Sequence, residues 1–136
     1  MLLVVDTNVI ISAALKRSIT QEVLFNRAFV CYAPEYVRDE IEKHKNEIMK
    51  KSQYKDEEFH TILSIIFSKL TIVPEEDYMK YKEEVLKFTP DPDDWPFLAL
   101  AMYLGAGLWT YDAALKEKQN IVKIVTTTDL LNLLRK

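Results

Sequence analysis

Short apolar runs that alternate with helical patterns predict an α/β protein of three layers, in which helices cover both faces of a central parallel sheet of about five strands. Two observations support this prediction. The chain opens on the apolar run Leu2–Val5, which stops abruptly at Asp6, as a fully buried strand does at its carboxyl end. Similar short runs recur between amphipathic stretches, and strands that are joined through helices pair in parallel.

The composition is that of an ordinary globular protein. A length of 136 residues suits one domain, 1–136, and shares of 49% hydrophobic and 29% charged residues suit a soluble chain. Cys31 is the single cysteine and is expected to be a small core residue, which fits a reducing cytoplasm. Because no leader-like or membrane-spanning run is present, we expect a cytoplasmic protein without membrane contact.

The net charge of −3 gives no basic footprint for a nucleic acid. A polyanion would have to be drawn by local lysines or by a bound cation.

Each element in the first half of the chain has a local reason. Ser18 and Thr20 mark a turn between two short helical patterns, and Pro34 suits the first turn of a helix rich in strong helix formers. A further helix carries apolar residues at helical spacing on its inner face. The expected elements are helices from Val9 to about Lys16, from Thr20 with Val23, Leu24 and Ala28, from Tyr36 to about Lys51 and over Lys55–Lys69, and a strand at Val30–Ala33.

Proline and glycine punctuate the second half. The run Thr89–Pro96 is dense in prolines and acids and announces a turn, after which 97–104 is apolar nearly all round and must be buried. Gly105 and Gly107 end that helix. The expected elements are strands at Thr71–Val73, Leu108–Thr110 and Lys123–Thr126, helices at Glu75–Leu86, Phe97–Leu104 and Ala113 to about Lys118, and a last helix capped by Thr128 or Asp129 and ending near Leu134.

Four acids share one expected place in the fold. Asp6 and Asp112 each follow a predicted strand, and Asp94 opens a buried helix. Glu40 lies on the helix after the second strand, within reach of the same sheet edge. Because ligands of open α/β sheets bind at the carboxyl ends of the strands, these side chains predict a site there.

Clustered carboxylates predict a metal, because they repel one another and take up protons unless a cation neutralises them. Oxygen ligands favour Mg²⁺ or Mn²⁺, and such an ion polarises a phosphoryl group and lowers the pKa of a bound water, as phosphodiester hydrolysis requires. The chain has no glycine-rich phosphate loop and no nucleophile elbow. His44 and His60 lie on different helices without a ligand partner at metal spacing, so we interpret both as surface or half-buried residues.

Each acid also has a purely structural interpretation, which stays open for every residue taken singly. Three of them suit helix caps, and the fourth suits an ion pair on a solvated helix face. The caps would be Asp6 with Thr7, Asp94 and Asp112, and the pair would join Glu40 to His44 or Lys43.

Together, four segments resemble the PIN domain in order and spacing, and the resemblance covers the whole chain. They are Val4–Asn8, Glu40–Ile41, Asp94–Ala101 and Leu108–Asp112. The resemblance implies a PIN-like three-layer α/β/α fold, with metal ligands at Asp6, Glu40, Asp94 and Asp112 and with Asn8 and Thr110 near the site. Many relatives carry another acid two residues after the fourth ligand. This chain has Ala114 there, which is expected to weaken a second metal site.

The resemblance also implies an activity and partners. Members are largely Mg²⁺- or Mn²⁺-dependent ribonucleases, and many small prokaryotic members are toxins of the VapC type, restrained by an antitoxin. We therefore expect an endoribonuclease that hydrolyses RNA phosphodiester bonds, with a small antitoxin as partner. The implied catalytic residues are Asp6, Glu40, Asp94 and Asp112, with Asn8 orienting a ligand or the scissile phosphate. The lysines at 43, 45, 50 and 51 either steer the RNA backbone or form a plain solvated face with Glu47.

Two other enzyme or signalling functions fit the sequence less well. A phosphohydrolase with Asp6 as nucleophile typically needs an acid where Asn8 stands, and a receiver-type signalling domain needs a lysine where Thr126–Thr128 stands. A catalytically weak PIN fold that serves as a nucleic-acid or protein binding module stays open. We also expect a homodimer, because the apolar residues Phe59, Ile62, Ile66 and Phe67, with Tyr78 and Tyr81, offer more surface than one small core needs.

Overall fold

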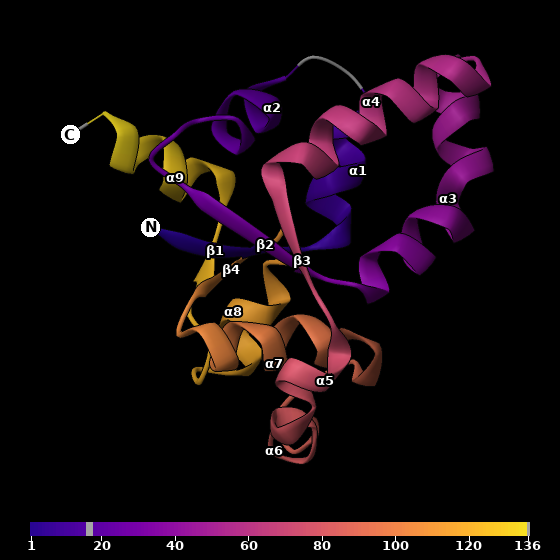
Figure 1. Ribbon diagram of the computed structural model, residues 1–136. Helices are drawn as coiled ribbons and strands as arrows, with labels where there is room; N and C mark the ends of the chain where they lie inside the picture. The colour runs from indigo at the N-terminus through magenta and orange to yellow at the C-terminus, as the bar shows by residue number, and fades with distance from the viewer. Residues whose placement is uncertain (16–17, 136) are drawn as a thin grey trace.

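The computed structural model describes residues 1–15 and 18–135, and its centre is a five-stranded parallel sheet in the order β3-β2-β1-β4-β5 (Figure 1). Its strands are β1 (Leu2–Val5), β2 (Val30–Pro34), β3 (Leu70–Val73), β4 (Gly107–Trp109) and β5 (Ile124–Val125). The opening strand lies in the middle, with Leu3 paired to Cys31 on one side and Val5 paired to Trp109 on the other. The predicted parallel sheet of about five strands is confirmed.

Helices cover both faces of the sheet, as Figure 1 shows. One layer holds α1 (Thr7–Leu15), α2 (Ile19–Leu24), α3 (Tyr36–Ser52), α4 (Asp56–Lys69) and α9 (Thr127–Leu134). The other holds α5 (Glu75–Tyr78), α6 (Lys82–Leu86), α7 (Trp95–Leu104) and α8 (Ala114–Lys118). Crossovers between parallel strands are right-handed, so the chain changes face when it stops building outward from β1 to β3 and returns to β4. The three-layer expectation is confirmed.

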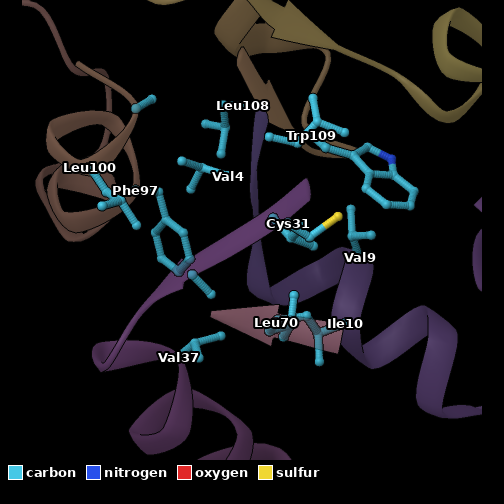
Figure 2. Close-up of a cluster of buried hydrophobic side chains, with 14 of the residues drawn as sticks. Val4, Val9, Ile10, Cys31, Val37, Leu70, Phe97, Leu100, Leu108 and Trp109 are labelled. Atoms are coloured by element: carbon cyan, nitrogen blue, oxygen red, sulfur yellow. The ribbon is translucent and has the colours of Figure 1, made fainter. Parts of the chain in front are cut away.

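The hydrophobic core forms where α7 and α1 pack against the central strands. Figure 2 shows Phe97 and Leu100 of α7 on one side of the strands and Val9 and Ile10 of α1 on the other. The residues of β1 from Leu3 to Val5 are fully buried, as an uninterrupted apolar strand between two helical layers must be. Cys31 is buried beside them, as predicted, and burial raises the pKa of its thiol to about 11.

Several element boundaries differ from the prediction. The helix expected near Val9 begins at Thr7, and its expected end at Lys16 lies outside the described residues. The second helix stops at Leu24, so that Ala28 lies outside it, because the Asn26 side chain accepts a hydrogen bond from the Ala28 amide at 2.8 Å and closes a turn.

The stretch Glu75–Leu86 is not the single helix that its pattern predicts. Tyr78 leaves the helical region with φ −115° and ψ 1°, and a 3₁₀ turn, Met79–Tyr81, separates α5 from α6. The rings of Tyr78 and Trp95 lie 5.8 Å apart, and the Lys82 amine lies 4.7 Å from the same indole. Packing of both segments on Trp95 accompanies the interruption and outweighs local helix propensity.

The cap of the last helix is also corrected. Its N-cap is Thr126, neither Thr128 nor Asp129. The Thr126 hydroxyl accepts from the Asp129 amide at 3.1 Å, and the Asp129 carboxylate accepts from the Thr126 amide at 2.9 Å. This reciprocal capping box begins the helix one residue after Thr126, because β5 ends at Val125 and is shorter than expected.

Among the described residues, no helix combines the length and the apolar character that crossing a membrane requires.

Candidate active site

Asp6 follows β1 directly and is held from two sides. Its Oδ1 accepts from the Thr7 amide at 2.8 Å, and its Oδ2 accepts from the Thr110 hydroxyl at 2.6 Å. The first bond is a partial helix cap, as the structural interpretation of Asp6 supposed. The second fixes the carboxylate against the end of β4, 104 residues away in the chain.

Through its hydroxyl, Thr110 takes part in three hydrogen bonds at this edge of the sheet. Its side chain is 1% exposed, and its hydroxyl oxygen also accepts from the Asp112 amide at 3.0 Å and from the Asn8 side chain at 3.4 Å. Asn8 in turn accepts from the Tyr111 amide at 3.3 Å. The ends of β1 and β4 are thereby locked together, and the predicted positions of Asn8 and Thr110 near Asp6 agree with these contacts.

Glu40 reaches the same edge from α3. Its Oε1 accepts from the buried Thr7 hydroxyl at 2.5 Å. Neither the His44 nor the Lys43 partner that the structural interpretation offered is bonded to it; His44 lies instead 3.5 Å from Glu47. Thr7 and Thr110 therefore each orient one carboxylate by a charge-assisted hydrogen bond.

Asp94 stands at the start of α7 without capping it. It occupies the N-cap position, yet its side chain makes no capping hydrogen bond. The structural interpretation of this acid as a cap is therefore not supported. Asp91 precedes it in the same turn, where its Oδ1 accepts from the Asp93 amide at 3.0 Å.

Asp112 is exposed just beyond β4. Its Oδ1 accepts from the Ala114 amide at 3.1 Å. The N-cap of α8 is Ala113 and makes no side-chain capping hydrogen bond, so the interpretation of Asp112 as the cap is not supported. Ala114, where many relatives carry a further acid, is the first residue of that helix and is also exposed.

These side chains line one pocket of about 370 Å³. Its walls come from the ends of β1 and β4, from α1 and α3, and from the turn before α7. The lining residues are Asp6, Thr7, Asn8, Ile11, Leu15, Glu40, His44, Glu47, Ile48, Lys51, Asp91, Asp94 and Asp112. A larger cavity of about 620 Å³ lies near β5, but its one acid, Asp129, is paired with Lys116 at 3.7 Å. The four predicted acids all line the smaller pocket, which is therefore the candidate site.

Burial and mutual repulsion shift the acids of this pocket. Burial, and after it the negative charges of Asp6, Asp91, Asp112 and Glu40, together raise the pKa of Asp94 to about 7. Burial likewise raises the pKa of Asp6, although its hydrogen bonds from Thr110 and Thr7 act in the opposite direction. Strongly perturbed carboxylates in a cleft are a physical sign of a functional site.

The chemistry of the donor set fits a hard divalent cation. The lining residues Asp6, Glu40, Asp94 and Asp112 offer carboxylate oxygens, which Mg²⁺ and Mn²⁺ prefer, and a cation would offset the mutual repulsion that contributes to the raised pKa of Asp94. Within 1–15 and 18–135, however, no three His, Cys, Asp or Glu side chains converge closely enough to hold an ion. The predicted acids share one pocket without a preformed ligand geometry.

Sequence patterns do not identify several residues of the pocket, among them three polar ones. They predict Thr7 only as part of a cap, Asp91 only as part of a turn, and His44 as a surface or half-buried residue. A signal existed for Asp91, since it lies three residues before Asp94 in an acidic run. The roles of Thr7 and His44 depend on how α1 packs on α3, which local patterns do not reveal.

The fold and the pocket together define a class: an α/β protein with an all-parallel sheet and a carboxylate cluster at its carboxyl edge. The family follows from the sequence. The profile of the PIN domain matches residues 4–131, and the chain belongs to the PIN domain family. The comparison with curated protein sequences gives no match.

Solved structures share this fold. One is VapBC2 from Rickettsia felis bound to a DNA fragment from its promoter, at 18% identity and a TM-score of 0.64, with 93% of this chain and 98% of that chain covered. A toxin-antitoxin complex from Klebsiella pneumoniae has 18% identity and a TM-score of 0.65, with 92% of this chain and 97% of that chain covered. VapBC-1 from nontypeable Haemophilus influenzae has 18% identity and a TM-score of 0.64, with 94% of this chain and 99% of that chain covered. At this identity the likeness establishes the fold alone.

Proposed function

We propose that this chain is a Mg²⁺- or Mn²⁺-dependent endoribonuclease that hydrolyses RNA phosphodiester bonds. The observation that carries the proposal is the pocket that Asp6, Glu40, Asp94 and Asp112 all line, with the pKa of Asp94 raised to about 7. A site that holds this much uncompensated charge is suited to a cation and, through it, to a phosphate. Membership of the PIN domain family supports the same activity.

The residues of the chain have distinct parts in this proposal. Asp6 and Asp94 would hold the cation, and Glu40 and Asp112 would complete its surroundings. The cation supplies charge that polarises the phosphoryl group and lowers the pKa of water. Thr110 and Thr7 keep the Asp6 and Glu40 carboxylates in place, and Asn8, which is tied to β4, orients a ligand or the scissile phosphate.

The test of this function is direct. Purified protein should cleave a mixed single-stranded RNA in Mn²⁺ or Mg²⁺ and should stop in EDTA. Full cleavage in EDTA would end the metal hypothesis. Absence of cleavage under every metal condition would favour the second candidate, a catalytically weak nucleic-acid or protein binding module. The residue Ala114 and the lack of a preformed three-ligand group among the described residues speak for that candidate.

An antitoxin partner is part of the proposal. One of the similar solved structures is a toxin-antitoxin complex, and the resemblance to the PIN domain implies that many small members are restrained by an antitoxin. If the proposal holds, a small protein encoded by the neighbouring reading frame should co-purify with this chain and suppress its RNA cleavage. Cleavage that is unchanged in the presence of that protein would argue against the pairing.

A homodimer stays a proposal with a narrower basis. Phe59, Ile66 and Tyr78, which suggested surplus apolar surface, are buried within the chain itself. The apolar surface that remains on α4 is the exposed Ile65 and the half-buried residues Ile62, Leu63 and Phe67. Sedimentation that shows a monomer at micromolar concentration would remove the proposal.

We expect Thr110→Val to weaken Mn²⁺ binding by about tenfold or more, within the range found when a group that orients a metal ligand is lost. Valine fills the same space but leaves Asp6 without its 2.6 Å hydrogen bond and Asp112 without an acceptor for its amide. Thr110→Ser keeps the hydroxyl and should bind nearly as well as the parent. Calorimetric titration measures both, and equal affinity in Thr110→Val and the parent would show that the hydroxyl does not support the site.

The affinity for Mn²⁺ or Mg²⁺ should also decrease as the pH is lowered. Because the pKa of Asp94 is about 7, protons compete with the cation below that pH, and affinity is expected to drop by up to about tenfold per pH unit. Above that pH the affinity should level off. Titrations at about pH 5.5 and about pH 8 measure the change. The Asp94→Asn variant should bind weakly with a flatter profile, and an unchanged parent affinity over this range would contradict the assignment of Asp94.

A further inference from the structure

The acidic pocket has a second, less acidic end that metal binding does not use. One face of α3 lines the pocket from Glu40 through His44 and Glu47 to Lys51. These eleven residue steps rise about 16 Å along the helix. That length exceeds the surroundings of a single ion, so part of the pocket is free for a ligand that continues beyond the carboxylates.

The chemistry of this end differs from that of the acidic end. Ile11 and Leu15 of α1 are half-buried and supply an apolar wall. On α3, Glu47 lies 2.9 Å from the Lys51 amine and 3.5 Å from the His44 ring, and all three line the same pocket. Among the described residues that line the pocket, Lys51 is the only lysine or arginine. All three polar side chains are about half exposed or more, with values of 62%, 59% and 48% for Lys51, Glu47 and His44, so they can exchange partners.

We propose that this end is a subsite for one unpaired nucleotide next to the scissile phosphate. The base packs on Ile11 and Leu15 with the His44 ring against it, and Lys51 leaves Glu47 to bind the adjoining phosphate. Flat rings, including histidine, and apolar side chains are the usual platform for an unstacked base, and a lysine binds phosphate as a point charge. This inference rests on the proposed endoribonuclease function.

The pocket favours single-stranded RNA over a duplex or a protein. Its volume of about 370 Å³ lies near the lower end of the range for small-ligand sites, enough for one splayed nucleotide but not for paired strands. The apolar wall suits a base, and the lysine suits the phosphate of the same nucleotide. The carboxylates at the other end of the pocket suit a bound cation. A protein segment would leave the charge of the acidic end without a counterpart unless it carried its own cation.

The test compares two lysines of the same helix. Lys51→Met should raise the KM for a short unpaired RNA about five- to tenfold with little change in kcat, and should reduce the salt dependence of binding by somewhat less than one unit of slope. Lys45→Met makes the same charge change, but the Lys45 amine lies 6.0 Å from the Phe59 ring, on another face of α3. Lys45→Met should keep the KM of the parent. Lys51→Arg, which keeps the positive charge, should have a KM close to that of the parent.

Glu47→Gln should change the KM in the opposite direction to Lys51→Met. Releasing Lys51 and His44 from Glu47 should lower the KM for unpaired RNA several-fold. If Lys51→Met and Lys45→Met weaken RNA equally, general charge attracts the substrate and the subsite is wrong. If RNA is unaffected and only binding of a co-purifying protein changes, the groove is a protein site. In both cases the parent still cleaves RNA, whereas a parent that never cleaves refutes the function itself.

Discussion

Replacing Asp6 by Asn is expected to lower metal-dependent RNA cleavage by more than about 100-fold. Loss of a group that merely orients a ligand costs 10–100-fold, and Asp6 would be a ligand itself. Asparagine keeps the volume and one acceptor for the Thr7 amide, and its amide group can donate to Thr110, so the fold should survive. Initial cleavage rates of a labelled RNA in Mn²⁺, together with circular dichroism of both proteins, measure the effect.

Two other acids provide controls for that experiment. Asp39→Asn removes the same charge beside Glu40 but outside the pocket, and should keep the parent rate. Asp112→Asn should cost only about tenfold, because Asp112 is exposed and asparagine can still accept from the Ala114 amide. Equal losses in Asp6→Asn and Asp112→Asn would mean that both acids bind the cation equally, and an active Asp6→Asn variant would remove Asp6 from the site.

Replacing Asp94 by Asn should reverse the stability order of parent and variant when metal is added. In EDTA the variant should be the more stable protein, because the folded state of the parent must hold a charge that its surroundings disfavour. The pKa of Asp94 is about 7 in the fold against 3.8 for an ordinary aspartate, so the parent loses stability as pH rises between these values. After allowance for solvent screening, the difference above pH 7 is on the order of 1 kcal/mol, or about 3 to 5 °C in Tm.

Millimolar Mg²⁺ should then favour the parent. Binding to the folded state alone adds about 2.7 kcal/mol at a hundredfold excess over Kd, and the variant gains less because it binds less. Thermal melts with EDTA and with Mg²⁺, at about pH 4 and about pH 8, test both halves. The two proteins should melt nearly together at the lower pH in EDTA. A parent whose Tm ignores Mg²⁺ would overturn the metal role of Asp94.

Asp94→Ala separates the electrostatic reason from a structural one. A capping aspartate would cost about 1 kcal/mol when truncated. Asp94 makes no capping hydrogen bond, so Asp94→Ala should resemble Asp94→Asn in EDTA. A clear loss of stability in the alanine variant alone would restore the interpretation of Asp94 as a cap.

The sequence by itself determined the sheet and the meeting of two acids. Leu2–Val5 reads as a buried strand because four apolar residues stop at a carboxylate, and the structure places it at the centre of the sheet. Since the carboxyl ends of parallel strands share an edge, acids that follow β1 and β4 had to come close. The predicted PIN-like fold is confirmed for the same reason, because its alternation of strands and helices is local information.

Only the tertiary structure decided how these acids are held and charged. Thr7 binds Glu40 across 33 residues, and Thr110 binds Asp6 across 104, so neither bond leaves a local pattern in the sequence. The raised pKa of Asp94 depends on burial and on four other carboxylates, three of which come from segments distant in the sequence. The 3₁₀ turn between α5 and α6 likewise accompanies packing on Trp95. Local patterns specify which segments form strands and helices, whereas burial and long-range hydrogen bonds arise only when those segments pack.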